Sequence, residues 1–388
     1  MIVRELGSVC DVTTGQSAPQ SEDAFSTTGI PFIRAGSLEP LLAGKAESSL
    51  ELIDDLSAKK HKLKLFPKDT ILFAKSGMSA KLARVYRIKS PCYVVSHLAA
   101  ILPSEDVDPG YLHRWFEANP PSNLIANDAY PSIKTSEISK VKIPLPPLPE
   151  QKRIAAILDK ADAIRRKRQQ AIQLADDFLR AVFLDMFGDP VTNPKGWETF
   201  ALADVVRKDS IITYGIVQAG EHLDGGVPYI RTGDFKDGKL VRSGYACTSA
   251  DIASKFKRSE VAPGDIVYCI RASVGSADVV PAFLAGANLT QGTAKISPAH
   301  DMKAEFLVEL LRSAGFRSWI DKNSKGATFK EITLARLREA PVFKPPMFEQ
   351  EAFIRIKKIV MERLAEKFQE ADVPLFESLS QKAFSGQL

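Results

Sequence analysis

Two long stretches of the chain place apolar residues at the spacing of an amphipathic helix. The first stretch runs from Glu150 to Phe187, and the second includes the residues that follow Phe353. An apolar stripe with polar flanks is typical of a helix that packs along a partner. We expect the packing residues to be Ile154, Ile157, Ala161, Ile164, Phe178, Val182, Phe353, Ile356, Val360 and Leu364.

A proline-rich segment stands before each predicted helix. The segment IPLPPLPEQ covers residues 143–151, and VFKPPMFEQ covers residues 342–350. Proline suits the first turn of a helix, where Pro149 stands, and glycine suits the position after the last turn, where Gly188 stands. The polyproline conformation is stiff, so these segments are expected to fix how each globular part meets its helix.

The two predicted helices differ in length. At about 1.5 Å per residue the first would span about 57 Å, which is longer than a domain of about 150 residues needs. Pro374 is expected to break the second helix, which would run to about Gln369 and be followed by a last helical segment at residues 375–384. Two such helices, one after each globular part, most simply pair antiparallel.

Outside the helices, short blocks of sequence occur twice in the same order. GIPFIRAG at residues 29–36 returns as GVPYIRTG at 226–233, and FPKDTILFAKSG at 66–77 returns as APGDIVYCIRAS at 262–273. Each block is typical of a strand next to a turn. With the proline-rich segments, the blocks repeat at offsets between 196 and 199 residues, which indicates a tandem duplication.

The duplication predicts an α+β fold with two similar, mixed α/β domains, called heads below. Two long helices would join them, pair as an antiparallel coiled coil and relate the two halves by a pseudo-two-fold axis. Within the heads, residues 110–118 and 304–320 show helical spacing. The predicted order is head 1 at residues 1–147, the central helix at 148–189, head 2 at 190–345 and the C-terminal helix at 346–388.

Composition narrows the class of protein. The 388 residues exceed one ordinary core. No apolar run reaches the ~18 residues of a membrane span, and MIVRELGSVC carries charges where a secretory signal is apolar. A cytoplasmic protein is expected. The scattered cysteines show no metal-ligand spacing and predict reduced, buried thiols and no metal site; they are Cys10, Cys92, Cys247 and Cys269.

Two inverted heads suit a duplex target. Duplex DNA has two-fold axes perpendicular to its length, so such heads can read two half-sites. The net charge of +5 permits nucleic-acid binding but is too small to argue for it alone. The segment after the repeated strand differs between the heads, RAGSLEPLLAGKAESS against RTGDFKDGKLVRSGYA. We therefore predict an asymmetric, bipartite target with an unread spacer.

Cations at equivalent places in the two heads are candidate phosphate contacts. They precede the Pro-x-Asp or Pro-Gly-Asp turn and are Lys59, Lys60, Lys62, Lys64, Lys255, Lys257 and Arg258. A solvated charged face is the alternative interpretation. Arg34 and Arg231, in the repeated IR, are either DNA contacts or structural ion-pair residues.

Two further pairs of loops are candidates for contact with DNA. Small Gly/Ser-rich loops follow the strand and let the backbone approach a duplex closely; their candidate residues are Lys75, Ser76, Ser79, Lys81, Arg271, Ser273 and Ser276. The segments NDAYPSIK and NSKGATFK offer side chains that can reach base edges, although an ordinary turn is the alternative; these are Asn127, Tyr130, Lys134, Asn323, Lys325 and Lys330.

The sequence argues against catalysis by this chain. NPPS at residues 119–122 resembles the (N/D)PP-aromatic motif of adenine methyltransferases, but Ser122 replaces the ring that would stack on a flipped base. The aspartate pairs at 54–55 and 176–177 are isolated, and no GxxxxGK(S/T) phosphate loop is present. We expect no catalytic residue.

The segments PLPPLPEQKRI and FLDMFGDP, which open and close the first helix, resemble those of the DNA-specificity subunit of Type I restriction–modification systems, as do the paired PFIR and PYIR blocks. The resemblance covers the whole chain in the order head, helix, head, helix. It implies that each head is a target-recognition domain and that the paired helices set the spacer between half-sites.

The resemblance also implies partners. Besides double-stranded DNA, these would be modification subunits, two in number, which methylate adenine with S-adenosylmethionine, and restriction subunits, which use ATP. Mg²⁺, S-adenosylmethionine and ATP would serve the partner subunits, and this chain would need no cofactor. The alternative hypothesis is a scaffold whose heads bind proteins and whose helices mediate oligomerisation.

Overall fold

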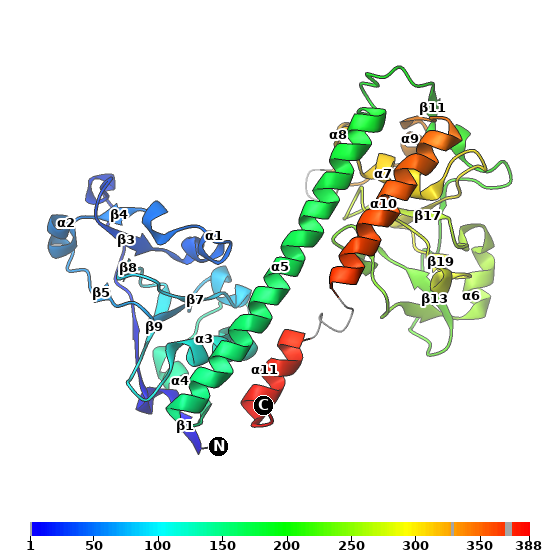
Figure 1. Cartoon of the computed structure of the whole chain (residues 1–388). Helices are drawn as coiled ribbons and strands as arrows, with labels where there is room; N and C mark the ends of the chain where they lie inside the picture. The colour runs from blue at the N-terminus through cyan, green and yellow to red at the C-terminus, as the bar shows by residue number, and fades with distance from the viewer. Residues whose placement is uncertain (1, 327–329, 369–374) are drawn as a thin grey trace. The chain divides into compact units, whose positions relative to one another are not determined.

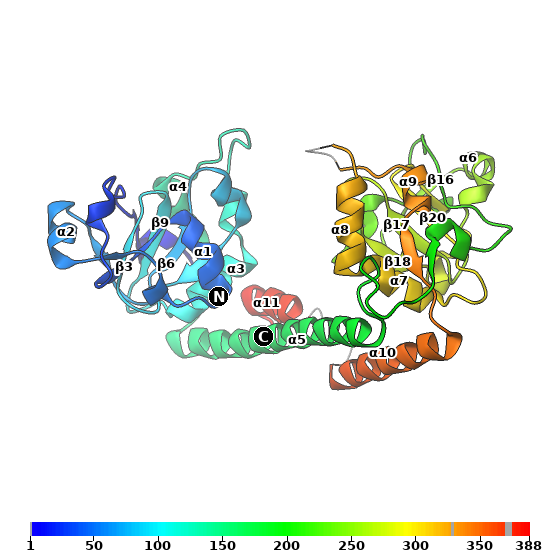
Figure 2. The same ribbon diagram turned by 90° about the horizontal axis from the view of Figure 1, so that it is seen from above.

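The computed structural model describes residues 2–326, 330–368 and 375–388 (Figures 1 and 2). Contacts within the chain divide it into two compact units. Unit 1 consists of residues 1–169 and 369–388, and unit 2 consists of residues 170–368. Each unit contains one head and parts of the long helices, and each is described by itself.

Head 1 is built on two sheets. The first is antiparallel with strand order β2-β9-β6-β7, and the second has the order β4-β3-β8-β5 with β3 parallel to β8. A separate antiparallel pair, β1 with β10, lies where the head meets its helix. The strands are β1 (Ile2–Glu5), β2 (Cys10–Thr14), β3 (Ile30–Ile33), β4 (Leu52–Ile53), β5 (Leu65–Phe66), β6 (Ile71–Ala74), β7 (Val85–Arg87), β8 (Cys92–Val94), β9 (Leu98–Pro103) and β10 (Lys142–Leu145).

Head 2 repeats this topology except for β5, which has no counterpart in the described sheets of head 2. Its sheets have the orders β12-β20-β17-β18 and β16-β13-β19, with β13 parallel to β19, and β11 pairs with β21 at the helix. The hairpin β14–β15 is a further element of this head. The strands are β11 (Thr199–Ala201), β12 (Thr213–Tyr214), β13 (Val227–Ile230), β14 (Phe235–Lys236), β15 (Lys239–Leu240), β16 (Ala246–Thr248), β17 (Ile266–Cys269), β18 (Ala277–Val279), β19 (Asn288–Leu289), β20 (Thr293–Ile296) and β21 (Pro341–Phe343).

Each head packs a short amphipathic helix on its first sheet. In head 1, Tyr111 and Phe116 share a core cluster with Phe73 of β6, and in head 2, Phe306 shares one with Tyr268 of β17. The α-helices of the heads are α1 (Leu38–Leu42), α2 (Asp55–Lys60), α3 (Pro109–Ala118), α4 (Thr135–Ser139), α6 (Ala250–Lys255), α7 (Ala304–Arg312), α8 (Ala314–Asn323) and α9 (Leu334–Arg338). The predicted internal repeat of two mixed α/β heads is confirmed.

One long helix follows head 1, and two helices follow head 2. α5 covers Leu148–Phe187, α10 covers Met347–Lys367 and α11 covers Leu375–Ser385. Gly188 follows α5 with a φ of 77°, and its N–H donates to the Leu184 carbonyl at 2.8 Å, as expected of a C-cap. The predicted helix end at Gln369 and the predicted break at Pro374 lie outside the described residues.

Helices pair antiparallel inside each unit. In unit 1, Arg153 donates to the main-chain oxygen of Leu388, and Arg165 lies 3.9 Å from Glu377, so α11 runs against α5. In unit 2, the ring of Phe353 at the start of α10 packs on Phe183 near the end of α5, at 5.5 Å between centroids. The antiparallel pairing is confirmed within each unit (Figure 1).

In each unit, a long-helix segment packs an aromatic ring on the head helix: α11 in unit 1 and the end of α5 in unit 2. Phe384 of α11 packs edge-on against Tyr111 of α3, with ring centroids 5.5 Å apart. In unit 2, Phe187 of α5 packs edge-on against Phe306 of α7 at 4.9 Å. Each unit is therefore one head on an antiparallel helix pair.

Candidate nucleic-acid interface

Strand ends of head 1 gather at one edge, which we call rim 1: Gln16, Arg34, Lys75, Ser76, Ser96 and His97. Arg34 follows β3, and Lys75 follows β6. The Lys75 N–H donates to the His97 carbonyl at 2.9 Å, because β6 and β9 are antiparallel neighbours. Polar and basic side chains thus meet where strands of both sheets end.

Hydrogen bonds order the centre of rim 1. Gln16 accepts the Ser96 N–H at its main-chain oxygen at 2.8 Å, and its side-chain oxygen accepts the Lys64 N–H at 3.1 Å. The Ser76 hydroxyl lies 2.8 Å from His97 Nδ1. His97 is exposed. Lys64, a predicted phosphate contact, is joined to the rim through Gln16.

The structure brings together the two loops predicted separately in head 1. The Gly77 N–H donates to the Pro131 carbonyl at 3.0 Å, and the Ile133 N–H donates to the Lys75 carbonyl at 2.7 Å. Lys81 forms an ion pair with Asp128 at 3.1 Å. The loop that contains Asn127, Tyr130 and Lys134 therefore lies against the loop that contains Lys75, Ser76, Ser79 and Lys81.

Head 2 builds the same edge, which we call rim 2: Ile216, Arg231, Arg271, Gln291 and Gly292. The Gln291 N–H donates to the Ile216 carbonyl at 3.1 Å, and the N–H of Ile270, which precedes Arg271, donates to the Gly292 carbonyl at 2.9 Å. These repeat the bonds of Ser96 to Gln16 and of Lys75 to His97. The backbone is shared, and the side chains differ.

Loops also converge at rim 2. Arg271 forms an ion pair with Glu331 at 2.8 Å, and the Ile332 N–H donates to the Ile270 carbonyl at 3.0 Å. Lys330 contacts Asp321 at 2.6 Å. Ser273 and Ser276 lie on the loop after Arg271, Lys325 pairs with Glu331, and Asn323 is the last residue of α8.

The other predicted cations are exposed, but on different elements. Lys59 and Lys60 lie in the last turn of α2, and Lys62 and Lys64 follow it; Lys255 ends α6, and Lys257 and Arg258 follow in a 3₁₀ turn. Arg34 lies 2.5 Å from Glu51, and Arg231 lies 2.8 Å from Asp234. Both arginines thus have the ion pairs that the alternative interpretation expects. Their contact with DNA stays a prediction.

One buried glutamine lies at each junction between a head and its helix: Gln151 for head 1 and Gln350 for head 2. We call them the junction glutamines; sequence reasoning did not identify them. They are 1% and 0% exposed. Gln151 donates to the carbonyls of Asp106 and Pro146 at 3.0 and 2.9 Å and accepts the Asp108 N–H at 2.8 Å. The only signal for them in the sequence is their repetition in the EQ of both proline-rich segments.

The helix residues predicted to pack are not uniformly buried. Ile154, Ala161 and Phe353 are buried, and Ile157, Val182, Ile356, Val360 and Leu364 are half-buried. Ile164 and Phe178 are 43% and 52% exposed. Part of the apolar stripe therefore remains exposed to solvent within each unit.

The described residues also have properties that concern metal binding, cysteine chemistry and membrane spanning. They contain no cluster of three or more side chains suited to hold a metal ion. All four cysteines are free; Cys10, Cys92 and Cys269 are buried, and burial raises the pKa of each thiol to about 12. No helix within the described ranges combines the length and apolarity of a membrane span.

The sequence is similar to known proteins. A family described as the Type I restriction modification DNA specificity domain matches residues 1–174 and again residues 194–367. The EcoBI specificity subunit of Escherichia coli is 24% identical over 99% of this chain and 85% of its own length. The putative MjaX specificity subunit of Methanocaldococcus jannaschii is 25% identical over 92% of this chain and 86% of its own.

A solved structure supports the fold. The crystal structure of a Type I restriction–modification S subunit from M. genitalium superposes with a TM-score of 0.54 at 14% identity and covers 99% of this chain and 96% of that one. Two matches to one domain family, in the order of the two heads, account for most of the sequence. The chain belongs to the family of Type I restriction–modification DNA specificity subunits.

Proposed function

We propose that this chain reads DNA for a Type I restriction–modification complex, with one head on each half of a bipartite, asymmetric target. The observation that carries the proposal is the pair of rims. Rim 1 presents Ser76 and His97 where rim 2 presents Arg271 and Gly292 on the same backbone. A shared frame with different side chains suits two half-sites of different sequence.

The contacts at the rims would divide by chemistry. Cations such as Lys64, Lys75 and Arg271 would hold phosphates, which fixes position without reading sequence. Neutral side chains such as Gln16 in head 1 and Gln291 in head 2 would bond to base edges, since an amide can donate and accept at once. Half-site identity then depends on the residues in which the rims differ.

The helices would space the heads and bind partners. Ile164, Phe178 and Ile359 are 43%, 52% and 57% exposed and would contribute to the surfaces that contact partners. We propose that the two helix pairs bind two modification subunits and that restriction subunits join this complex in the cytoplasm. Adenine methylation with S-adenosylmethionine, and steps that need ATP and Mg²⁺, would belong to those partners.

The test measures DNA recognition directly. Deleting the gene and reading methylated adenines across the host genome should abolish methylation at one bipartite motif. Purified with its modification subunit, the chain should retain duplexes at low salt and release them as salt rises. An unchanged methylation pattern would contradict the proposal, and failure to retain any duplex would favour the scaffold alternative.

A further inference from the structure

The head helix that packs on the long helices starts at an equivalent position in both units. Each junction glutamine accepts a main-chain N–H at 2.8 Å, from Asp108 in unit 1 and from Lys303 in unit 2. These contacts align α3 with α7 residue by residue. The sixth residue after each starting point is Arg114 in unit 1 and Glu309 in unit 2.

The charges at these equivalent positions are opposite. Arg114 is followed three residues later by Glu117, whereas Glu309 is followed three residues later by Arg312. Each pair forms an ion pair within its own helix, at 2.6 Å in α3 and 3.1 Å in α7. Head 2 therefore carries the pair of head 1 with both signs reversed.

In unit 1 the arginine contacts carboxylates of α5. Arg114 lies 2.8 Å from Asp159 and 3.2 Å from Asp162, and Arg114 and Asp162 are only 6% and 2% exposed. Burial alone would lower the pKa of Arg114 and raise that of Asp162, but the pairing outweighs burial and shifts both pKa values the other way. Both groups are charged, so this contact is a buried ion pair.

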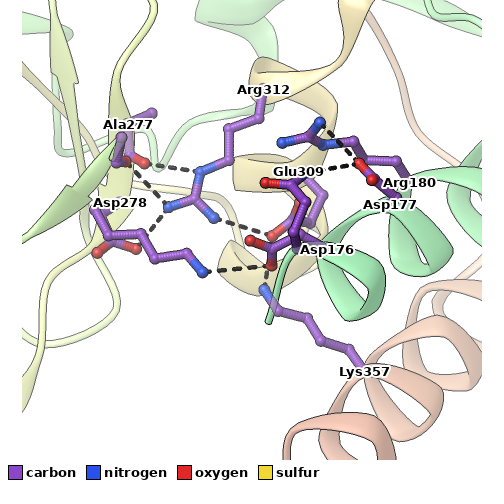
Figure 3. Close-up of polar contacts among 11 residues, drawn as sticks. Asp176, Asp177, Arg180, Ala277, Asp278, Glu309, Arg312 and Lys357 are labelled. Atoms are coloured by element: carbon purple, nitrogen blue, oxygen red, sulfur yellow. Dashed lines mark hydrogen bonds and ion pairs between the residues drawn. The ribbon is translucent and has the colours of Figure 1, made fainter. Parts of the chain in front are cut away.

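In unit 2 the glutamate contacts a cation of α10. Lys357 Nζ lies 2.7 Å from the Glu309 carboxylate (Figure 3). Arg312 holds the same carboxylate and reaches Asp278 at 2.9 Å. Burial alone would raise the pKa of Glu309, but Lys357 and Arg312 keep it below its usual value. In unit 2, α10 thus presents a positive charge to the head helix, whereas in unit 1 α5 presents negative charges to it.

We propose that these contacts of opposite sign make each head specific for its own helix, because a head placed at the other position meets like charge. Moved into unit 2, Arg114 would face Lys357, beside the Asp176 carboxylate of α5 that lines the same cavity; moved into unit 1, Glu309 would face Asp159 and Asp162. The exchange replaces attraction by repulsion between groups that, apart from the half-exposed Asp159, are mostly buried, which is more costly than losing an exposed ion pair. Discrimination by repulsion as well as attraction is how interfaces reject wrong partners.

The inference concerns assembly of the chain and holds whatever the heads bind. A head exchanged at its own position keeps its helix contact if it carries the same sign. Exchange across positions requires a matching change in the helix. The contact therefore determines which recombined chains fold well.

The test transplants head 1 into unit 2 by replacing residues 199–344 with residues 3–145. Hydrogen exchange of the full-length chimaera and of the parent chain reports the protection of α10. Lys357→Glu should raise protection at least about tenfold in the chimaera and lower it by a similar factor in the parent. Arg355→Glu changes the charge equally at a nearby exposed position and should alter neither.

Two results would overturn the proposal. One is a Lys357→Glu effect of the same sign in both chains; the other is a chimaera whose α10 is as protected as in the parent. Should the chimaera not fold, the parent supplies a second measurement. Glu309→Arg should lower protection of α10, and adding Lys357→Glu should restore part of it. No restoration would refute the proposed matching of charges.

Discussion

Gln151 and Gln350 occupy equivalent places at the two head–helix junctions and make the same three hydrogen bonds. Gln350 donates to the carbonyls of Asp301 and Pro345 at 3.1 and 2.8 Å and accepts the Lys303 N–H at 2.8 Å. One buried side chain thus joins the proline-rich segment, the loop before the head helix and the first turn of that helix. The junction is fixed by this amide as well as by the prolines.

Replacing a junction glutamine should destabilise one unit only. Gln151→Leu removes the three bonds and leaves two carbonyls and one N–H buried without partners, which should lower the free energy of unfolding of unit 1 by roughly 3 kcal/mol. Hydrogen exchange of the full chain measures this for each unit. Gln173→Leu is the matched control, since Gln173 is exposed and, among the described residues, its side chain bonds only to Asp177. Equal loss of protection in both units would contradict the prediction.

Two equivalent glycines allow close approach of strands and should not tolerate a methyl group. A Cβ on Gly15 would lie 2.0 Å from the Val94 carbonyl oxygen, and one on Gly215 would lie 2.1 Å from that of Leu289. Backbone must move, so Gly15→Ala and Gly215→Ala should each lower the thermal midpoint by several degrees, about 2 kcal/mol or more. Gly36→Ala, with open space around it, should leave the midpoint within about a degree.

Acid should weaken unit 1 through Asp162. Its pKa is held below the usual 3.8 because Arg114, Arg165 and Arg166 outweigh its burial. The folded state therefore favours the charged carboxylate, and the resulting stability is present above pH 3.8 and is lost as pH falls through the lower folded-state pKa. The free energy of unfolding, measured with urea, should fall between about pH 5 and about pH 2. Asp162→Asn should reduce the slope of this free energy against pH. An unchanged slope in the variant would argue against the assignment.

Rim cations should contribute sequence-blind affinity for DNA. Lys75→Ala should weaken binding of all duplexes alike and lower the slope of log affinity against log salt by about 1, since one phosphate contact is lost. Arg271→Ala should act in the same way through head 2. Lys142→Ala, on β10 beside the helix junction, is the control and should change neither quantity. A changed methylation motif for Lys75→Ala would instead assign Lys75 to base reading.

The proposed spacer role of α5 predicts an effect of its length. Deleting residues 167–173 removes about 10 Å of helix, which corresponds to about three base pairs. The methylated motif should keep both half-sites and shorten its spacer. Replacing the same residues by alanine should leave the spacer unchanged. An unchanged spacer in the deletion variant would contradict the role of α5 as a spacer.

The helices and repeated strands could be predicted because their signals are periodic. The stripe that ends at Phe187 and Gly188 marks α5, and the repeated blocks at residues 66–77 and 262–273 mark β6 and β17. The internal repeat then allowed the elements of the second head to be predicted from those of the first. Local spacing is sufficient for such features, because each is determined by neighbours in the sequence.

Contacts between distant residues could not be predicted in this way. In the sequence, Asp162 and Arg114 are separated by a 3₁₀ turn, helix α4, strand β10 and the loops between them, and either residue alone is typical of an exposed helix face. The same holds for Lys75 and the loop around Asn127, which only the folded head places together. The apolar pattern also did not show that Ile164 and Phe178 would remain uncovered within their units.

The placement of α11 has a consequence for synthesis on the ribosome. Unit 2 is one continuous segment, residues 170–368, whereas unit 1 needs residues from both sides of it. Domains fold as their sequence emerges, so the nascent head 1 waits with the face around Tyr111 uncovered while the whole of unit 2 is translated. The first head to be made is therefore the last to be completed.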